Sequence, residues 1–169
     1  MDRRTLLAAA AASSFIVKEA LASERPMSRR FQILDSVIAA WRARDIDAAL
    51  SHMHDDIVWH YAAAIAPPLK GKAQARKFLE NFASQISEVK WRIFDYAENG
   101  DRLFVEGVDE YIAKDGARVA APYAGVVEFK GDLIIGWRDY FDRGVVDGMK
   151  AGGSASAQVE QLIARPSAS

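Results

Sequence analysis

Three turn signals in the second half of the chain constrain its fold most strongly. They are Asn99-Gly100, Lys114-Asp115-Gly116 and Lys130-Gly131-Asp132. Asn-Gly is the strongest short-range signal for a hairpin, and a glycine in each of the other two supplies the backbone freedom of a tight turn. Between the turns, apolar and polar residues alternate as they do in strands. The sequence therefore predicts four consecutive antiparallel strands, at 89–98, 102–113, 118–129 and 133–142.

The segments before these strands carry helical periodicity instead. Apolar residues recur at spacings of three and four from Phe31 onward, which predicts an amphipathic helix that ends near Arg44. Asp45 is a suitable N-cap for a short second helix over 46–52. Residues 71–86 carry the apolar stripe of a third helix.

A short strand is predicted at 57–61, after a turn at 54–56, because its residues are mainly β-branched or aromatic. With helices first and a meander after them, the fold class is α+β. We expect a cone-shaped, curved antiparallel sheet wrapped around three N-terminal helices, with one face of the sheet left uncovered. The aromatic residues on the strands favour an apolar ligand pocket between the sheet and the helices.

The composition excludes several classes of function. The chain has 169 residues, a formal net charge of −1 and no cysteine. There is therefore no electrostatic case for nucleic-acid binding, and no disulfide, thiolate nucleophile or cysteine-bound zinc. No apolar run is long enough to span a bilayer. No phosphate loop, dinucleotide fingerprint or serine elbow is present, and we expect neither a cofactor nor a metal.

Both ends of the chain are predicted to lie outside the folded domain, which we place at residues 28–148. Residues 1–22 resemble an export signal of the twin-arginine type, because an arginine pair precedes a short Ala-rich stretch and Ala20-Leu21-Ala22 offers a cleavage site. This signal predicts a periplasmic protein, or a cytoplasmic one if the segment is an ordinary Ala-rich helix. Residues 149–169, rich in Gly, Ser and Ala, are predicted to form a flexible or loosely docked tail.

A carboxylate near the end of the last predicted strand is the main candidate for chemistry. Asp139 lies between Trp137 and Phe141, and in a strand these three side chains share one face. A carboxylate between aromatic rings is costly in a dry core, whereas in a pocket a carboxyl group with a shifted pKa can transfer protons. The alternative is a structural acid at a strand end, paired with Arg138 or Arg92.

The order of elements and the last strand together resemble the nuclear transport factor 2-like superfamily. The matching features are a helix, a short helix, a short aromatic strand, a Pro-Pro loop, a Gly-led helix and a meander that ends in Gly-Trp-Arg-Asp-Tyr-Phe-Asp at 136–142. Within the superfamily, residues 31–147 look most like the limonene-1,2-epoxide hydrolases. The general topology is shared with SnoaL-type polyketide cyclases and with many binding proteins.

The resemblance implies roles for individual residues. The acid that activates water in the hydrolase family falls on Asp139, and the acid that donates a proton falls on Asp109. The arginine that bridges the two acids falls on Gly107, and the Tyr and Asn that hold the water fall on Trp59 and Tyr61. Two acids are therefore kept and three helper residues are changed.

The changed helpers have physical consequences for the site. Two nearby carboxylates cannot both ionise cheaply, so we expect one pKa to rise and the pair to share a proton. Gly107 is expected to leave a hole that enlarges the pocket beside the acids, and Trp59 can only donate a hydrogen bond. The predicted substrate-binding residues, which include two further tyrosines of pocket-facing parity, are Trp59, Tyr61, Tyr111, Tyr123, Trp137 and Phe141.

Other polar residues on the strands have ordinary structural interpretations. Glu106 and Glu110 have the opposite parity to Asp109 and are predicted to be solvated, although a one-residue bulge would exchange these assignments. Asp109 itself has an alternative as an edge-strand acid opposite a basic partner. His60 is expected to point away from the pocket, with a catalytic role as the minor alternative.

The sequence therefore supports three hypotheses about function. The first is a cofactor-independent acid–base enzyme, specifically a hydrolase of a small hydrophobic epoxide, with Asp139 as base and Asp109 as acid. The second is a dehydratase, isomerase, cyclase or lyase in which Asp139 removes a proton from carbon. The third is a pocket protein that binds an apolar ligand without catalysis.

The face of the sheet opposite Asp109 is predicted to be apolar and open. A lone monomer would expose this patch, which is typical of an interaction surface. We therefore expect a homodimer through the open face, whose apolar residues are Phe94, Phe104, Val108 and Ile112.

Overall fold

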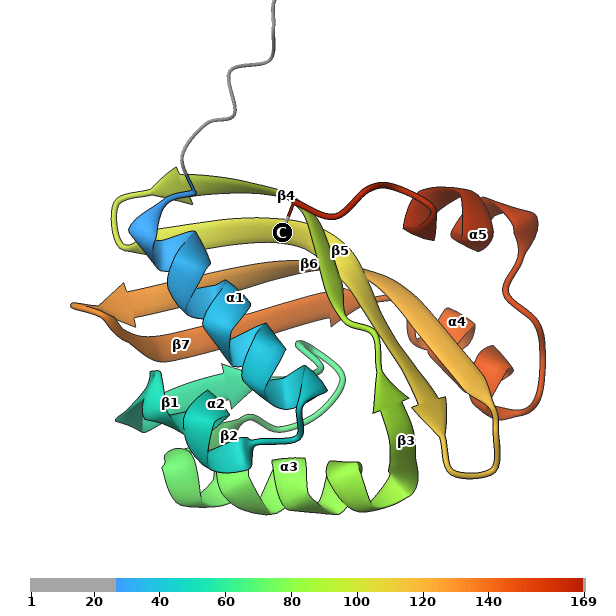
Figure 1. Ribbon diagram of the computed structural model, residues 1–169, viewed down its shortest axis with the longest axis horizontal. Helices are drawn as coiled ribbons and strands as arrows, with labels where there is room; N and C mark the ends of the chain where they lie inside the picture. Colours follow the sequence, from blue (N-terminus) through green and yellow to red (C-terminus); the bar gives the residue numbers. More distant parts are fainter. Residues whose placement is uncertain (1–26, 169) are drawn as a thin grey trace, which may run out of the picture.

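A strongly curved sheet wraps around the first helix, and the third helix lies below its lower edge in the view of Figure 1. The computed structural model describes residues 27–168, so the predicted export signal at 1–22 lies outside the described residues. The helices are α1 (Arg29–Arg42), α2 (Ile46–Ser51), α3 (Lys72–Gln85), α4 (Arg143–Lys150) and α5 (Ala157–Ile163). The strands are β1 (Met53–His60), β2 (Leu69–Lys70), β3 (Ile86–Val89), β4 (Arg92–Asn99), β5 (Arg102–Ala113), β6 (Arg118–Lys130) and β7 (Leu133–Phe141).

The first two helices begin at side chains that satisfy free backbone N–H groups. Ser28 accepts a hydrogen bond from Phe31 N at 3.2 Å, and Asp45 accepts one from Ala48 N at 2.9 Å. The buried stripe of α1 then packs into the curve of the sheet, and its members are Phe31, Ile33, Leu34, Val37, Ile38 and Trp41. None of the described helices is long and apolar enough to cross a membrane.

The four-stranded meander is confirmed, and the sheet that contains it is mixed. The strand order is β2-β1-β7-β6-β5-β3, with β4 also paired to β5. The three hairpins turn at Gly100, Gly116 and Gly131, whose φ angles of 59°, 88° and 62° favour glycine. Strand β1 joins β7 in parallel and places Trp59 opposite Trp137. The α+β fold is therefore confirmed, with one parallel pair in a sheet expected to be antiparallel.

Two local predictions about the strands are wrong. Residues 54–56, predicted as a turn, belong to β1. The predicted strand 89–98 is divided between β3 and β4, and both of these pair with β5. A bulge at Phe94 interrupts the register of β4 with β5. As a result Tyr96 stacks on Phe31 of α1, with 4.0 Å between ring centroids.

The C-terminal segment, predicted to be flexible or loosely docked, folds against the outer face of the sheet. Helix α5 buries Val159 and Ile163. The chain then returns to β4, where Ala168 N donates a hydrogen bond to Ile93 O at 2.8 Å. The composition of 149–169 conceals this packing, because two apolar side chains among Gly, Ser and Ala are enough to anchor a short helix.

Ion pairs attach this C-terminal segment to the strands. Arg118 on β6 pairs with Glu160 of α5 at 2.6 Å and with Glu110 of β5 at 2.8 Å. Glu110 is 5% exposed and is also held by Arg92 at 2.8 Å. The expectation of a solvated Glu110 is therefore wrong, because two guanidinium groups compensate a buried carboxylate.

The outer face of the sheet is less open than the sequence predicts. Val108 is fully buried, and Arg165 lies over the ring of Phe94 at 5.1 Å. Phe104 remains exposed, at 39%. The chain covers part of the face through which a homodimer is expected, so the dimer stays a prediction and has a smaller apolar surface available to it.

Replacing Ile163 by Ala tests whether α5 belongs to the folded domain. Ile163 is 2% exposed, so losing its buried carbons should lower the free energy of unfolding by about 2–4 kcal/mol. The neighbouring Leu162 is 48% exposed, and Leu162→Ala is the matched control, with an expected change below about 0.5 kcal/mol. Urea unfolding measures both variants. Equally small effects would show that the segment does not pack on the sheet.

Candidate active site

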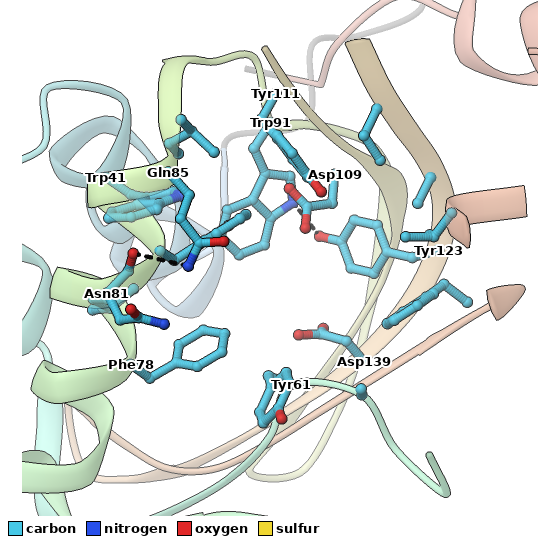
Figure 2. Close-up of a pocket in the computed structure, with 18 of the residues that line it drawn as sticks. Trp41, Tyr61, Phe78, Asn81, Gln85, Trp91, Asp109, Tyr111, Tyr123 and Asp139 are labelled. Carbon is cyan, nitrogen blue, oxygen red and sulfur yellow. Dashed lines mark hydrogen bonds between the residues drawn. The ribbon is translucent and has the colours of Figure 1, made fainter. Parts of the chain in front are cut away.

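A cavity of about 690 Å³ lies between the concave face of the sheet and helices α1 and α3. Figure 2 shows Asp109 and Asp139 pointing into it from the sheet, across from Phe78 of α3. A cavity of this size, with few converging polar groups, is typical of a site for a small hydrophobic molecule. Its wall is rich in aromatic rings and includes the four tryptophans of the chain, Trp41, Trp59, Trp91 and Trp137.

Every residue that the sequence analysis assigns to the site lines this cavity. They meet there because alternate residues of β1, β5, β6 and β7 face the concave side of one curved sheet. His60 has the opposite parity and does not belong to the lining, as expected. The predicted residues that line the cavity are Trp59, Tyr61, Asp109, Tyr111, Tyr123, Trp137, Asp139 and Phe141.

Asp139 is a carboxyl group set among indole rings. Trp137 Nε1 donates a hydrogen bond to Asp139 Oδ1 at 2.8 Å. Burial is the main cause that raises the pKa of Asp139, to about 7. The hydrogen bond from Trp137 opposes this rise, and the negative charge of Asp109 adds to it. Asp139 is therefore close to half protonated at neutral pH.

Trp59 presents a second indole to the same carboxyl group. The rings of Trp59 and Trp137 lie 5.6 Å apart between centroids. The buried Nε1 of Trp59 has no hydrogen-bond partner. It lies near enough to Asp139 to favour the ionised form and so to lower its pKa, without the alignment of a formed bond. The site thus offers one unused N–H donor beside the carboxyl group, available to a ligand oxygen or to a small movement of Asp139.

Asp109 is the second carboxyl group of the cavity with a raised pKa. Burial raises the pKa of Asp109 to about 6, and the positive charge of Lys150 opposes this rise. Lys150 ends α4 and also lines the cavity. Burial raises the pKa of the neighbouring Tyr111 to about 12, with a contribution from the negative charge of Asp109.

The two acids lie on opposite sides of β6 rather than against each other. Asp109 is on β5 opposite Ala121, and Asp139 is on β7 opposite Gly125. With about 4.8 Å between neighbouring strands, the two backbones are roughly 10 Å apart across the sheet alone. Within residues 27–168 no hydrogen bond joins the two carboxyl groups. The expected direct sharing of a proton is therefore corrected, because burial is the main cause of both raised pKa values.

The pKa values of the two acids lie close together. Burial raises the pKa of Asp109 to about 6 and that of Asp139 to about 7. Because the charge of Asp109 also raises the pKa of Asp139, the two groups titrate as a coupled pair.

Tyr123 on β6 stands between the strands that carry the acids. Its hydroxyl oxygen accepts a hydrogen bond from Trp91 Nε1 at 2.6 Å. Burial raises the pKa of Tyr123 well above its usual value, and the charges of Asp139 and Asp109 raise it further. Tyr123 therefore stays a neutral phenol across the pH range in which the acids titrate.

Gly107 does not leave the predicted hole. It is directly opposite Tyr123 in the β5–β6 ladder. A Cβ at this position would lie 2.3 Å from Arg92 O and 3.1 Å from Tyr123 Cε1. The backbone of β4 and the ring of Tyr123 therefore fill the space, and the expectation of a pocket enlarged by Gly107 is wrong.

Several polar or aromatic lining residues escaped the sequence analysis, among them Trp91, Asn81, Gln85 and Lys150. Trp91 lies at the break between β3 and β4, where one continuous strand is predicted. Asn81 and Gln85 are one turn apart on α3, and Gln85 Nε2 donates a hydrogen bond to Asn81 O at 3.2 Å. Their spacing of four residues, beside the apolar stripe of the helix, was the sequence signal that could have placed them in the cavity wall. Lys150 follows the predicted domain boundary, and no pattern in the sequence pointed to it.

The arrangement can transfer protons with its own side chains. Two carboxyl groups with pKa values of about 6 and 7 give and take protons near neutral pH, and the aromatic wall holds an apolar molecule next to them. Within the described part of the chain, no group of three or more His, Asp or Glu residues is placed to hold a metal ion.

Comparison with protein families identifies the family to which this chain belongs. A family model described as the SnoaL-like domain matches residues 34–137, more than half of the chain. This chain belongs to the SnoaL-like domain family. A comparison with curated proteins finds no match.

Solved structures with the same fold share little sequence with this SnoaL-like domain. A LEH-like epoxide hydrolase from M. tuberculosis has a TM-score of 0.65 at 21% identity, over 74% of this chain and 91% of that one. A nuclear transport factor 2-like protein of unknown function from Burkholderia pseudomallei gives 0.61 at 20%, over 81% and 98%. TerC, co-crystallised with polyporic acid, gives 0.64 at 21%, over 72% and 98%. These similarities confirm the nuclear transport factor 2-like fold.

Replacing Asp139 by Asn tests the burial of this carboxyl group in the SnoaL-like domain. A carboxyl group with a raised pKa favours folding at low pH, and that stability is lost as the pH rises through about 7. The amide has no charge to bury. Relative to the parent, the free energy of unfolding of Asp139→Asn should therefore increase between about pH 5 and pH 8.5, by up to about 3 kcal/mol.

Urea unfolding at the two pH values measures this change. The control is Asp56→Asn, because the Asp56 side chain is 87% exposed and its replacement should show no such trend. An effect of Asp139→Asn that is the same at both pH values would contradict a carboxyl group withdrawn from water.

Proposed function

We propose that this protein is an acid–base enzyme for a small hydrophobic substrate, and that its reaction is the hydrolysis of an epoxide. The observation that carries the proposal is the pair of half-buried carboxyl groups, Asp109 and Asp139, with pKa values of about 6 and 7 in one apolar cavity. Such a pair supplies an acid and a base at the same pH. The LEH-like epoxide hydrolase of the same fold supports the choice of reaction.

In this reaction one carboxylate takes a proton from water while the water oxygen bonds to an epoxide carbon. The C–O bond of the ring breaks with its electron pair left on oxygen, and the second carboxyl group protonates that oxygen to give a diol. The resemblance assigns the base to Asp139 and the acid to Asp109. Trp137 holds Oδ1 of Asp139, which leaves Oδ2 to accept the proton from water.

The active form of the site carries one proton on the two acids together. Below about pH 6 both acids are protonated and the base is lost, and above about pH 7 both are ionised and the acid is lost. Each turnover moves the proton from Asp109 to Asp139, so the starting protonation state must be restored before the next turnover.

A second reaction, proton abstraction from carbon, is favoured by the changed water site. Trp59 and Tyr61 occupy the positions that hold the water in the hydrolase family, and an indole cannot accept a hydrogen bond from water. Gly107 has no room for the bridging arginine. In a dehydratase, isomerase, cyclase or lyase, Asp139 alone would act as the base, and the SnoaL-like family match is compatible with such chemistry.

Incubation with small hydrophobic epoxides in ¹⁸O-labelled water tests the first reaction. We expect a diol that carries the label on one oxygen, and a loss of rate of about 100-fold or more in Asp139→Asn and in Asp109→Asn, because each removes a proton-transfer group. Asp56→Asn is the control and should keep the parent rate. Exchange of a substrate C–H for deuterium without diol formation would favour the second reaction instead.

The pH dependence of kcat/KM separates the two reactions. Hydrolysis by the acid–base pair predicts a bell-shaped profile with limbs near pH 6 and pH 7, since it needs one proton on the pair. A single carboxylate base predicts a rise through about pH 7 to a plateau. Diol formation with a plateau at high pH would contradict the role of the second acid.

A further inference from the structure

The lining of the cavity becomes polar where it meets solvent. Most of the lining residues are buried or half-buried, and these are chiefly aromatic or aliphatic. The lining residues that are exposed are all polar, and they form the rim of the cavity: Asn81, Gln85, Lys114, Asp115 and Lys150. The cavity therefore has an apolar interior and a polar, partly charged opening.

Three segments that are distant in sequence form this rim. Lys114 follows β5 in the turn to β6, and its backbone N donates a hydrogen bond to Gln85 O at the end of α3, at 3.0 Å. Lys150 ends α4, and the preceding Met149 accepts a hydrogen bond through Sδ from Ala120 N of β6, at 3.2 Å. Figure 1 shows the end of α3, the β5–β6 turn and α4 on the same side of the molecule, at the right of the view. Two lysines are thus brought to the opening of one cavity.

The chain leaves the positive charge at the rim without a close counterion. Within residues 27–168, neither Lys114 nor Lys150 forms an ion pair with a carboxylate. Asp115 is the acid of the rim, and its Oδ1 accepts a hydrogen bond from Ala117 N at 3.0 Å, which holds it within its own turn. The charge of Lys150 also acts on Asp109 inside the cavity. The two ammonium groups are therefore available to an anion at the opening.

The cavity extends from a reacting end to this charged end. Lys114 is five positions beyond Asp109 along β5 and its turn, which corresponds to roughly 15 Å at about 3.3 Å per residue. Between them lies Tyr111, which is buried and lines the cavity. A molecule that reaches from the acids to the rim must therefore have an apolar body of considerable length.

We propose that the substrate is amphipathic, with an apolar body in the aromatic cavity and a carboxylate at the rim beside Lys114 and Lys150. This inference rests on the proposed function and names its substrate class, which is a hydrophobic acid whose reacting group lies far from its carboxylate. The carboxylate stays partly hydrated at the exposed rim, so binding it does not require the full cost of desolvating a charge. A neutral hydrophobic molecule fills the same interior and leaves both lysines unpaired.

Two ligands with the same chain and different head groups test the rim. Binding of decanoate and of 1-decanol can be followed by tryptophan fluorescence, because the four tryptophans of the chain line the cavity. We expect Lys114→Met combined with Lys150→Met to weaken decanoate binding by roughly five- to tenfold and to leave 1-decanol binding within about twofold, because two exposed charge pairs are lost. Equal effects on both ligands, or no effect on decanoate, would overturn the inference.

Two further variants control this measurement. Lys114→Arg combined with Lys150→Arg keeps both charges and should keep decanoate binding. Lys70 is an exposed lysine of β2 that does not line the cavity, so Lys70→Met should bind both ligands as the parent does. Weaker decanoate binding in Lys70→Met would show an effect of net charge rather than of the rim, and would also overturn the inference.

Activity separates this inference from the proposed reaction. The substrates are 10,11-epoxyundecanoate and 1,2-epoxyundecane, which differ in the carboxylate. The ratio of their kcat/KM values should favour the acid in the parent and fall by roughly tenfold when both lysines are replaced by Met; any effect of Lys150 on Asp109 acts on both substrates and cancels in this ratio. Hydrolysis with an unchanged ratio overturns the inference and keeps the reaction. Decanoate binding that depends on the lysines, without hydrolysis of either epoxide, refutes the reaction and keeps the amphipathic ligand.

Discussion

The partial withdrawal of Asp109 and Asp139 from water is the constraint on which the site depends. Each carboxylate loses part of its hydration in an aromatic cavity, and the fold offers limited compensation: one bond from Trp137 to Asp139 and the positive charge of Lys150 for Asp109. Holding a proton is the less costly response, so both pKa values rise. The burial that weakens the fold at high pH is thus the same feature that makes the two groups useful as acid and base near neutrality.

Glycine at two inward positions makes room for neighbouring groups beside the acids. Gly107 admits the backbone of β4 and one edge of the Tyr123 ring, while a Cβ at Gly125 would lie 3.0 Å from Asp139 Oδ1. An arginine between the acids would favour their ionised forms, whereas the phenol of Tyr123 and the indole of Trp91 carry no charge. The aromatic rings beside the acids therefore carry no charge that would favour ionisation, in keeping with the raised pKa values of both acids.

The sequence predicted which of these residues line the cavity because strand alternation and three glycine turns decide which side chains of β5, β6 and β7 face inward. Asp109 and Asp139 fell on the concave side for this reason. The failures involve contacts between segments distant in sequence. The bulge at Phe94 accompanies the packing of β4 on α1, Ile163 docks on an apolar area of the sheet, and the space at Gly107 is filled because β4 passes close to it. Local patterns do not report such contacts.

Titration of the aspartate side chains tests the central claim most directly, which is that both acids are withdrawn from water in one cavity. The Cγ resonances of ¹³C-labelled aspartate can be followed against pH and assigned to Asp109 and Asp139 by replacing each with Asn. We predict midpoints of about 6 for Asp109 and about 7 for Asp139. Midpoints near the ordinary aspartate value of about 4 for both residues would contradict the claim.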